Sequence, residues 1–96
     1  MRNYEVAVIA NPDLDEQSIQ ALEGKISGWI TAAEGKALDV QRWGRRRLAY
    51  PIEGNTDGFY LFIQTEMPPQ AGVSIERELQ LNEDVLRFMI TRTDEG

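Results

Sequence analysis

Residues 36–67, KALDVQRWGRRRLAYPIEGNTDGFYLFIQTEM, carry the pattern from which the fold can be predicted outward in both directions. The first part, residues 36–50, alternates between apolar and polar side chains, which predicts a half-buried strand. Gly44 lies within it, where we expect a bulge or a bend, and Pro51 is expected to end it. The apolar residues that share one phase of the alternation are Leu38, Val40, Leu48 and Tyr50.

The second part of the same segment predicts a turn followed by another strand. The sequence EGNTDG at residues 53–58 has the composition of a turn, and FYLFIQTEM at residues 59–67 predicts a strand. Its first five residues are apolar on both faces, although successive side chains point to opposite sides of a sheet. Such an apolar excess often marks a partner surface, and a moderately exposed strand in a small domain is the alternative.

Toward the N-terminus, the sequence predicts a further strand and a helix. Residues 4–10, YEVAVIA, are rich in β-branched types and predict a strand. Residues 15–33 carry apolar side chains at helical spacing, which predicts an amphipathic helix with one buried stripe. We expect a capping-box-like start formed by Asp13 and Glu16, and Gly35 as the residue that ends the helix.

Toward the C-terminus, residues 70–82 predict a shorter helix and residues 85–92 a fourth strand. The order strand, helix, strand, strand, helix, strand is that of two βαβ halves. Such halves form the ferredoxin-like split arrangement, a four-stranded antiparallel sheet with both helices on one face. The other face of the sheet stays open. No linker or repeat interrupts the chain, so we expect one α+β domain over residues 1–96.

Composition excludes several classes of function. The 96 residues contain no cysteine and no histidine, which removes thiol nucleophiles, disulfides, the commonest general base and the commonest metal ligand. We therefore expect no enzymatic activity, no catalytic or metal-binding residue and no cofactor. The acids Asp13, Asp15 and Glu16 are better explained by capping and the helix dipole than by a metal cluster.

The overall charge bears on location and on partners. Sixteen acidic residues against ten basic ones give a net charge of -6, which favours solubility and opposes general coating of nucleic acid. No apolar run approaches the roughly 20 residues that span a bilayer, so we expect a cytoplasmic protein that does not contact membranes. The loop ANPDLD between the first strand and helix would repel phosphate, which argues against a small phosphatase of this fold.

Basic residues are nevertheless concentrated in one place. Four of the ten fall within six positions, namely Arg42, Arg45, Arg46 and Arg47. In a strand, Arg45 and Arg47 point together and Arg46 points the opposite way. The flanking Trp43 and Tyr50 could stack on unpaired bases while guanidinium groups grip the RNA backbone. Pairing of these arginines with the many acids of the chain remains the alternative.

Several short motifs resemble the bacterial small-subunit ribosomal protein six family. They are Arg-Arg-Leu-Ala-Tyr-Pro-Ile at 46–52, Met-Arg-Asn-Tyr-Glu at 1–5, Asn11-Pro12 with Leu14-Asp15, Gly58-Phe59-Tyr60 and Glu66-Met67-Pro68. The resemblance runs in order from Arg2 to about Arg92 and implies the same ferredoxin-like fold. It also implies that the protein binds the central domain of small-subunit ribosomal RNA within the ribosome. The heterodimer partner that it implies is small-subunit ribosomal protein eighteen.

These observations give two sets of candidate residues. The candidate RNA-binding residues are Arg2, Tyr4, Arg42, Trp43, Arg45, Arg46, Arg47, Tyr50, Arg87 and Arg92. The candidate partner-binding residues are Phe59, Tyr60, Phe62 and Ile63. Arg2, Arg87 and Arg92 are included because we expect the first and fourth strands to lie centrally in the sheet. The rival hypothesis is a non-RNA regulatory module of the same fold that self-associates through its open sheet.

Overall fold

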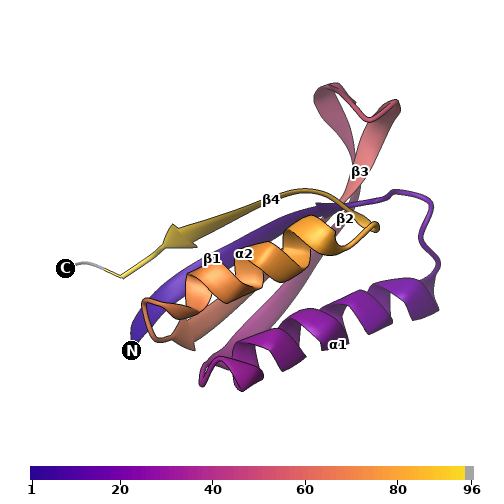
Figure 1. The fold of residues 1–96 in the computed structure, drawn as a ribbon. Coiled ribbons are helices and arrows are strands. Elements are labelled where there is room, and N and C mark those ends of the chain that lie inside the picture. The colour runs from indigo at the N-terminus through magenta and orange to yellow at the C-terminus, as the bar shows by residue number, and fades with distance from the viewer. Residues whose placement is uncertain (95–96) are drawn as a thin grey trace.

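The computed structural model describes residues 1–94, and Glu95 and Gly96 lie outside the described part. Its elements follow the predicted order, and four strands form one antiparallel sheet in the order β2-β3-β1-β4. The elements are β1 (Arg2–Ala10), α1 (Glu16–Ala32), β2 (Lys36–Ile52), β3 (Asn55–Met67), α2 (Ala71–Leu81) and β4 (Val85–Arg92). Both helices cover one face of the sheet, so the predicted ferredoxin-like split βαβ fold is confirmed (Figure 1).

The sheet order corrects one prediction, because β1 and β3 are the central strands and β4 lies at an edge. The connection from β1 through α1 to β2 leaves one strand position free between β1 and β2. Strand β3 occupies that position and pairs antiparallel with both of them. Strand β4 can then pair only with the outer side of β1, and Arg87 and Arg92 consequently lie on an edge strand.

The core lies between the sheet and the helices. Alternate residues of β1 (Val6, Val8) and of β3 (Leu61, Ile63) are at most 1% exposed and point toward the helices. They meet the buried stripes of both helices, and each fully buried aliphatic side chain contributes roughly 1.5–3 kcal/mol to stability. The buried helix residues in this cluster are Leu22, Ile26, Ile30, Ala71, Ile75 and Leu79.

Both ends of α1 differ in detail from the prediction. The N-cap is Asp15, whose carboxylate accepts a hydrogen bond of 2.8 Å from the backbone N–H of Ser18, so the predicted pairing of Asp13 with Glu16 is wrong. At the other end, Glu34 and not Gly35 adopts the left-handed conformation, with φ 67°. Gly35 is required for a different reason, because a Cβ there would lie 2.7 Å from the Cβ of Met67.

Strands β2 and β3 form a long hairpin whose tip projects beyond the rest of the sheet (Figure 1). The predicted stop at Pro51 and the predicted six-residue turn are wrong, because β2 continues to Ile52 and only Glu53 and Gly54 make the turn. Both turn residues have positive φ, 49° and 80°, as a two-residue type I′ hairpin turn requires. Pro51 is tolerated because it lies on an edge strand where the pairing register is irregular.

Three irregularities interrupt the pairing of β2 with β3, the last of them between Arg47 and Ile52, and the first two change which side chains of β2 share a face. The register shifts between Ala37 and Asp39 and again between Arg42 and Gly44, where Gly44 has φ 80° and confirms the predicted bulge. Each of these first two shifts inserts an extra residue, so a strict two-residue alternation does not continue through the strand. The bulge at Trp43 therefore separates Leu38 and Val40 from Leu48 and Tyr50, and of these four residues only Leu48 is buried.

Candidate RNA and protein interface

The sheet face that the helices leave uncovered, here called the open face, carries two rows of side chains across its strands. In the first row, Ile9 of β1 lies between Tyr60 of β3 and Arg87 of β4. In the second row, Ala7 lies between Phe62 and Met89. Directly opposed residues of antiparallel strands present their side chains on the same face. The alternation that buries the core residues of these strands thus brings aromatic and aliphatic side chains together on the open face.

Strand β2 adds a third aromatic residue to this face. The ring centroid of Trp43 lies 4.6 Å from that of Phe62, and the ring centroid of Tyr60 lies 6.4 Å from that of Phe62. Trp43 occupies the bulge beside Gly44 and is 54% exposed. The rings are tilted by 52° and 33°, so they form an uneven apolar surface and not a set of parallel stacking platforms.

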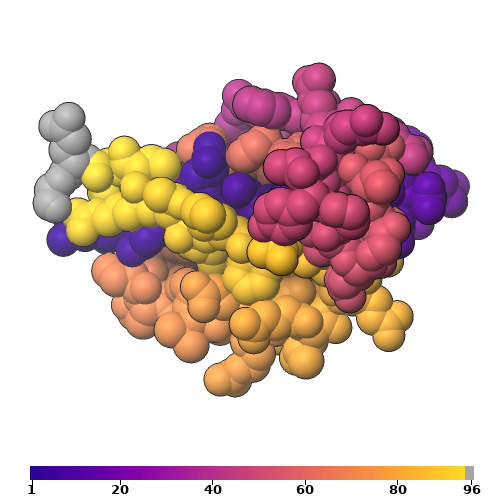
Figure 2. All heavy atoms as spheres, turned by 90° about the horizontal axis from the view of Figure 1, so that it is seen from above, coloured from indigo at the N-terminus to yellow at the C-terminus, as the bar shows by residue number. Residues whose placement is uncertain are grey.

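A hollow of about 310 Å³, here called the open-face hollow, lies within this surface. Its lining is almost entirely apolar, and one cation stands among the lining residues. They are Ala7, Val8, Ile9, Tyr50, Tyr60, Phe62, Arg87 and Met89. The guanidinium carbon of Arg87 lies 5.7 Å from the centroid of the Tyr50 ring, a cation–π contact between β4 and the hairpin. Figure 2 shows the hairpin atoms as a group beside the atoms of β1 and β4.

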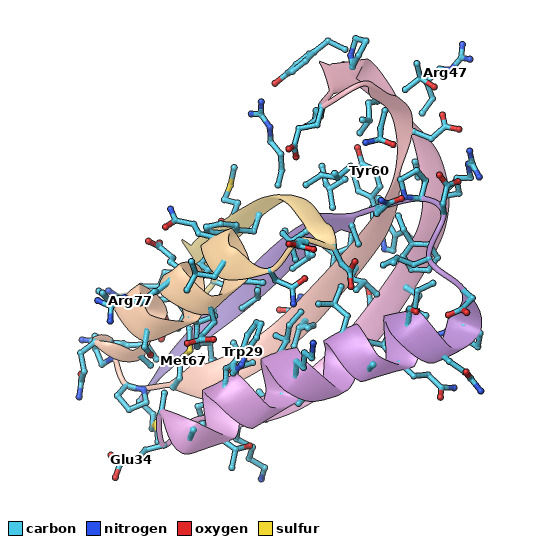
Figure 3. All side chains as sticks on the ribbon, turned by 45° about the vertical axis from the view of Figure 1, so that its right-hand side comes forward. Trp29, Glu34, Arg47, Tyr60, Met67 and Arg77 are labelled. Carbon is cyan, nitrogen blue, oxygen red and sulfur yellow. The ribbon has the colours of Figure 1, made fainter. Side chains whose placement is uncertain are left out.

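The three adjacent residues Arg45, Arg46 and Arg47, here called the hairpin arginines, lie on the projecting part of β2. Arg45 and Arg47 pair with Phe59 and Asp57, and Arg46 pairs with Gly58, so their side chains alternate between the faces as predicted. The Nε of Arg45 donates a 3.0 Å hydrogen bond to Asp57. Within residues 1–94, no ion pair or hydrogen bond holds the guanidinium of Arg46 or Arg47. In Figure 3, Arg47 points away from the hairpin into open space.

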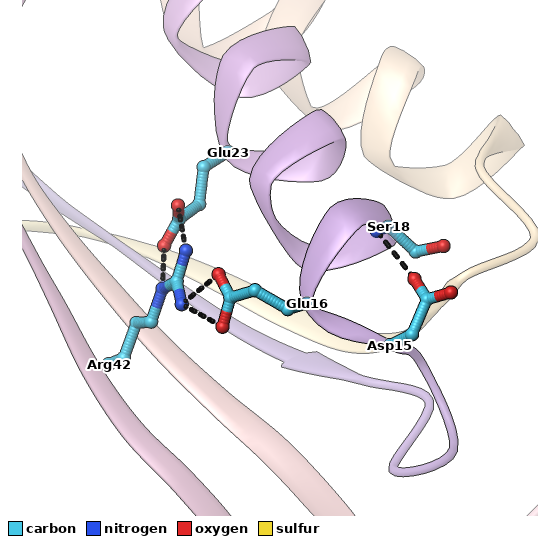
Figure 4. A network of polar contacts seen from close by, with 5 residues as sticks. All are labelled: Asp15, Glu16, Ser18, Glu23 and Arg42. Atoms are coloured by element: carbon cyan, nitrogen blue, oxygen red, sulfur yellow. Dashed lines mark hydrogen bonds and ion pairs between the residues drawn. The ribbon is translucent and has the colours of Figure 1, made fainter.

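Arg42 is held very differently (Figure 4). Its Nε and one terminal nitrogen donate hydrogen bonds of 2.7 and 2.8 Å to the two carboxylate oxygens of Glu23. The other terminal nitrogen donates to both oxygens of Glu16, at 2.9 and 2.7 Å. These bonds, chiefly those to Glu23, raise the pKa of the Arg42 guanidinium above its ordinary value. Because two carboxylates of α1 occupy this guanidinium, the structure gives Arg42 a role in joining β2 to α1.

Arg2, Tyr4 and Arg92 lie at the opposite end of the sheet from the hairpin arginines. Arg2 pairs with Met67 and Arg45 pairs with Phe59, so eight residues of β3 separate them, roughly 27 Å at about 3.4 Å per residue.

Two of these three side chains also have neighbours of their own. Tyr4 packs against the core on the helix side. The Nε of Arg92 donates a 2.7 Å hydrogen bond to Asp94 and lowers the pKa of that carboxyl group.

The structure also divides the four predicted partner-binding residues. Tyr60 and Phe62 lie on the open face and are partly exposed. Ile63 is 0% exposed in the core and Phe59 packs against the core, so these two side chains do not lie on the open face. The physical reason is alternation, because residues 59, 61 and 63 face the helices while residues 60 and 62 face away from them.

Three residues of the open face were absent from the sequence prediction: Ala7, Ile9 and Met89. The alternation of β1 and β4 contained the signal, since residues 6, 8 and 10 are buried while residues 5, 7 and 9 are only half-buried. Among residues 1–94, no group of three or more acids could hold a metal ion. Neither helix of that part has the length and apolar composition that a membrane crossing requires.

A helix-covered sheet with an uncovered apolar face and a projecting cationic hairpin is the architecture of a small binding protein. The family model described as ribosomal protein S6 matches residues 3–92, and this chain belongs to that family. It is 35% identical over 95 residues to small ribosomal subunit protein bS6 of Moorella thermoacetica, covering 99% of this chain and 97% of the relative. The bS6 protein of Symbiobacterium thermophilum is 40% identical over 95 residues, covering 99% of this chain and all of the relative.

A solved structure supports the same assignment. The crystal structure of 30S ribosomal protein S6 from Thermotoga maritima aligns with a TM-score of 0.90 at 26% identity. The alignment covers 96% of this chain and 87% of that protein. The relatives are structural proteins of the ribosome and not enzymes. This chain is accordingly a structural protein of the small ribosomal subunit, and its location is the ribosome.

Proposed function

We propose that this chain, acting as one domain in the cytoplasmic ribosome, binds the central domain of small-subunit ribosomal RNA together with small-subunit ribosomal protein eighteen. The observation that carries the proposal is the pair Arg46 and Arg47. They project from a hairpin without any carboxylate partner among residues 1–94, in a chain with sixteen acids. A cation that the protein does not neutralise is available to a phosphate group.

The two ligands are assigned to adjacent parts of the molecule. The hairpin arginines are assigned to RNA, because guanidinium groups bind phosphate through a planar fork of donors. The open face is assigned to the protein partner, because its hollow is apolar and its rings are not parallel. Trp43, Tyr50 and Arg87, predicted from the sequence as RNA contacts, belong to this partner surface by position.

The other candidate RNA residues have different places in the proposal. Arg2 and Arg92 are assigned to a second RNA segment, since their end of the sheet is far from the hairpin. Arg42 positions the strand and does not contact RNA, because Glu16 and Glu23 already occupy its guanidinium. Tyr4 packs on the core and has no direct role in RNA binding.

Net charge makes the proposal testable. At a net charge of -6, the acids of this chain repel phosphate around the hairpin arginines, so the isolated chain should bind RNA weakly. A basic partner would offset that field and contribute contacts of its own. We expect a coupling free energy of at least about 1–3 kcal/mol between partner binding and RNA binding.

The experiment is a titration of an RNA transcript of the central domain at fixed salt concentration. The transcript is titrated with this chain, with ribosomal protein eighteen, and with an equimolar mixture of the two. The proposal expects the mixture to bind far more tightly than either protein alone. Equal affinity of this chain with and without the partner would contradict cooperative binding and leave an autonomous RNA-binding protein.

The uncovered apolar face also supports the rival function of a self-associating module. The two functions respond differently to salt. Binding to RNA weakens steeply as salt rises because counterions are released from phosphate, whereas apolar association of two copies does not. Sedimentation of the chain alone, at low and high salt, distinguishes them. A stable dimer that excludes the partner would support the rival.

A further inference from the structure

The projecting part of the hairpin, residues 46–58, is a two-stranded ribbon, here called the ribbon. The pairing of β1 with β3 ends at Ala10 and Phe59, so the part of β3 before Phe59 has only β2 beside it. Pairing within the ribbon is itself interrupted, because the register shifts between Arg47 and Ile52. An isolated two-stranded hairpin is at most marginally stable in water. The orientation of the ribbon relative to the sheet therefore depends on contacts with the rest of the chain.

A hollow of about 450 Å³, here called the turn hollow, lies between the hairpin turn and the start of β4. Its lining includes Glu53 of the turn, residues 79–83 at and after the end of α2, and residues 85–88 of β4. Because a hollow of this size separates them, the turn is not packed against β4 at this point. Arg87 lines the turn hollow and also the open-face hollow, so it stands between the two.

Arg87 reaches across this gap to the ribbon. Its guanidinium carbon lies 5.7 Å from the centroid of the Tyr50 ring, within the range of a cation–π interaction. Among residues 1–94, the Arg87 side chain has no ion pair with a carboxylate that would hold it elsewhere. Tyr50 follows Arg47 by three residues on the same strand. A contact that fixes Tyr50 therefore also restricts the part of β2 that carries Arg46 and Arg47.

Arg45 connects the hairpin to the loop before α1 at a different point. Its terminal nitrogen lies 3.9 Å from the carboxylate of Asp13, and these side chains are 58% and 79% exposed. Exposed ion pairs of this kind contribute little. Arg45 also lies just before the ribbon, whereas Tyr50 lies five residues farther along the strand. The contact of Tyr50 with Arg87 consequently opposes tilting of the ribbon more directly.

We infer that Arg87 is a positioning residue for RNA binding. Its contact with Tyr50 holds the ribbon at one angle to the sheet and so keeps Arg46 and Arg47 in place for a phosphate group. Fixing a binding group beforehand lowers the conformational entropy that is lost on association. Arg87 acts through Tyr50 and does not itself bind phosphate. This inference rests on the proposed function, because it takes Arg46 and Arg47 to be RNA contacts.

Substitutions in the full chain can remove the contact from either side. Arg87→Met removes the cation, and Tyr50→Leu removes the ring. Arg87→Lys keeps a cation and Tyr50→Phe keeps a ring, so both should retain the contact. Arg87 and Tyr50 are exposed, so these variants should fold normally. Arg77→Met is the matched control, since Arg77 is an exposed arginine on α2, which lies on the covered side of the sheet (Figure 3).

The first measurement is a distance distribution in the chain alone, without RNA or partner. The sequence contains no cysteine, so Ala49→Cys on the ribbon and Gln80→Cys on α2 provide unique sites for spin labels, and both positions are exposed. We expect Arg87→Met and Tyr50→Leu to broaden the distribution of distances between the labels, measured by pulsed electron paramagnetic resonance. The two conservative variants and the control should leave it as narrow as in the parent. An unchanged width in Arg87→Met and Tyr50→Leu overturns the inference, whatever the RNA affinity.

The second measurement is RNA affinity over a range of salt concentrations, with ribosomal protein eighteen in fixed excess. We expect Arg87→Met and Tyr50→Leu each to weaken binding by about two- to fivefold, the factor that corresponds to one exposed cation–π contact. The double variant should lose no more than either single variant, because both remove the same contact. The slope of log affinity against log salt should equal that of the parent, since no phosphate contact is removed.

The outcomes separate this inference from the proposed function. A slope lower by about 0.7–0.9 in Arg87→Met would show that Arg87 neutralises a phosphate group directly, which overturns the inference while the proposed function stands. A broadened distance distribution with full RNA affinity would overturn it as well, because the angle of the ribbon would then not matter for RNA. If the parent pair does not bind RNA, the proposed function fails and the role in RNA binding falls with it. The distance measurement would still decide whether Arg87 holds the ribbon.

Discussion

Arg42 and the pair Arg46 and Arg47 lie on the same strand, four or five residues apart, and have opposite surroundings. The guanidinium of Arg42 donates four hydrogen bonds to two glutamates of α1. Those of Arg46 and Arg47 have no carboxylate partner among residues 1–94. Arginine thus joins β2 to α1 at position 42, whereas at positions 46 and 47 its charge is available to a ligand.

The difference arises from where β2 runs relative to α1. At Arg42 the strand passes beside the helix, and Glu16 and Glu23, seven residues apart, present carboxylates on one side of it. A few residues later the hairpin projects away from the helices (Figure 1), and Glu16 and Glu23 form no ion pair with Arg46 or Arg47. Availability to RNA is therefore decided by neighbouring side chains and not by the local density of arginine.

The largest expected effect of this difference is on RNA binding. Replacing both Arg46 and Arg47 by alanine should lower the affinity of the assembled pair for RNA by roughly 100-fold, at about 1.4 kcal/mol for each charge-assisted hydrogen bond that the change removes. The slope of log affinity against log salt should fall by about 0.7–0.9 for each phosphate group that the variant no longer neutralises. Filter binding or calorimetry over a range of salt concentrations measures both quantities.

Stability supplies the control for this experiment. Arg46 and Arg47 are exposed and make no ion pair among residues 1–94, so the double variant should unfold within about 0.5 kcal/mol of the parent. An unchanged RNA affinity in a variant that folds normally would remove the hairpin from the RNA interface. Equal losses of RNA affinity for Arg42→Met and the double variant would abolish the distinction between the two positions.

The fold was predictable from the sequence because its signals are local. Hydrophobic period and turn composition identified all six elements in order, and the split βαβ arrangement followed from that order. The error in the predicted turn also had a local cause. The turn at Glu53 and Gly54 was placed within too long a loop, because the polar residues after Gly54 belong to the projecting part of β3.

The site was predictable only in part because its contacts join distant segments. Glu16 and Glu23 lie 26 and 19 residues before Arg42 in the sequence, and no local pattern pairs them with it. The bulge beside Gly44 was expected, but its placement of Trp43 against Phe62 depends on the register of β2 with β3. Availability of a side chain is a property of packing, and residue type alone does not reveal it.

The next effect in size concerns stability. Arg42→Met removes every bond between β2 and the two glutamates, and it leaves two like charges close together. We expect a loss of about 1 kcal/mol, because paired charges in a partly exposed network contribute modestly. For a domain of this size, that loss lowers the melting temperature by roughly 4–8 °C. RNA affinity of the assembled pair should remain within about twofold, which thermal unfolding and RNA titration of one preparation can check.

A charge reversal tests whether the ion pair itself is responsible. Arg42→Glu alone should destabilise the chain more than Arg42→Met, because three carboxylates then meet. Adding Glu23→Arg to that variant restores one opposed pair and should recover part of the stability. Absence of any recovery would mean that Arg42 stabilises the strand through its apolar stem and not through its charge.

The smallest expected effect concerns the start of α1, from which Glu16 reaches Arg42 (Figure 4). The hydrogen bond from the backbone N–H of Ser18 holds the pKa of Asp15 below its ordinary value of 3.8. A carboxyl group whose pKa is lowered by folding stabilises the folded chain above the unfolded pKa, and that contribution is lost as the pH falls through the folded pKa. The stability difference between the parent and Asp15→Ala should thus be full near about pH 7 and shrink below about pH 4. Asp15→Asn, which caps without titrating, should keep its advantage over Asp15→Ala throughout this range. A parent-to-alanine difference that stays constant from about pH 7 to about pH 3 would show that the cap does not depend on the charge of Asp15.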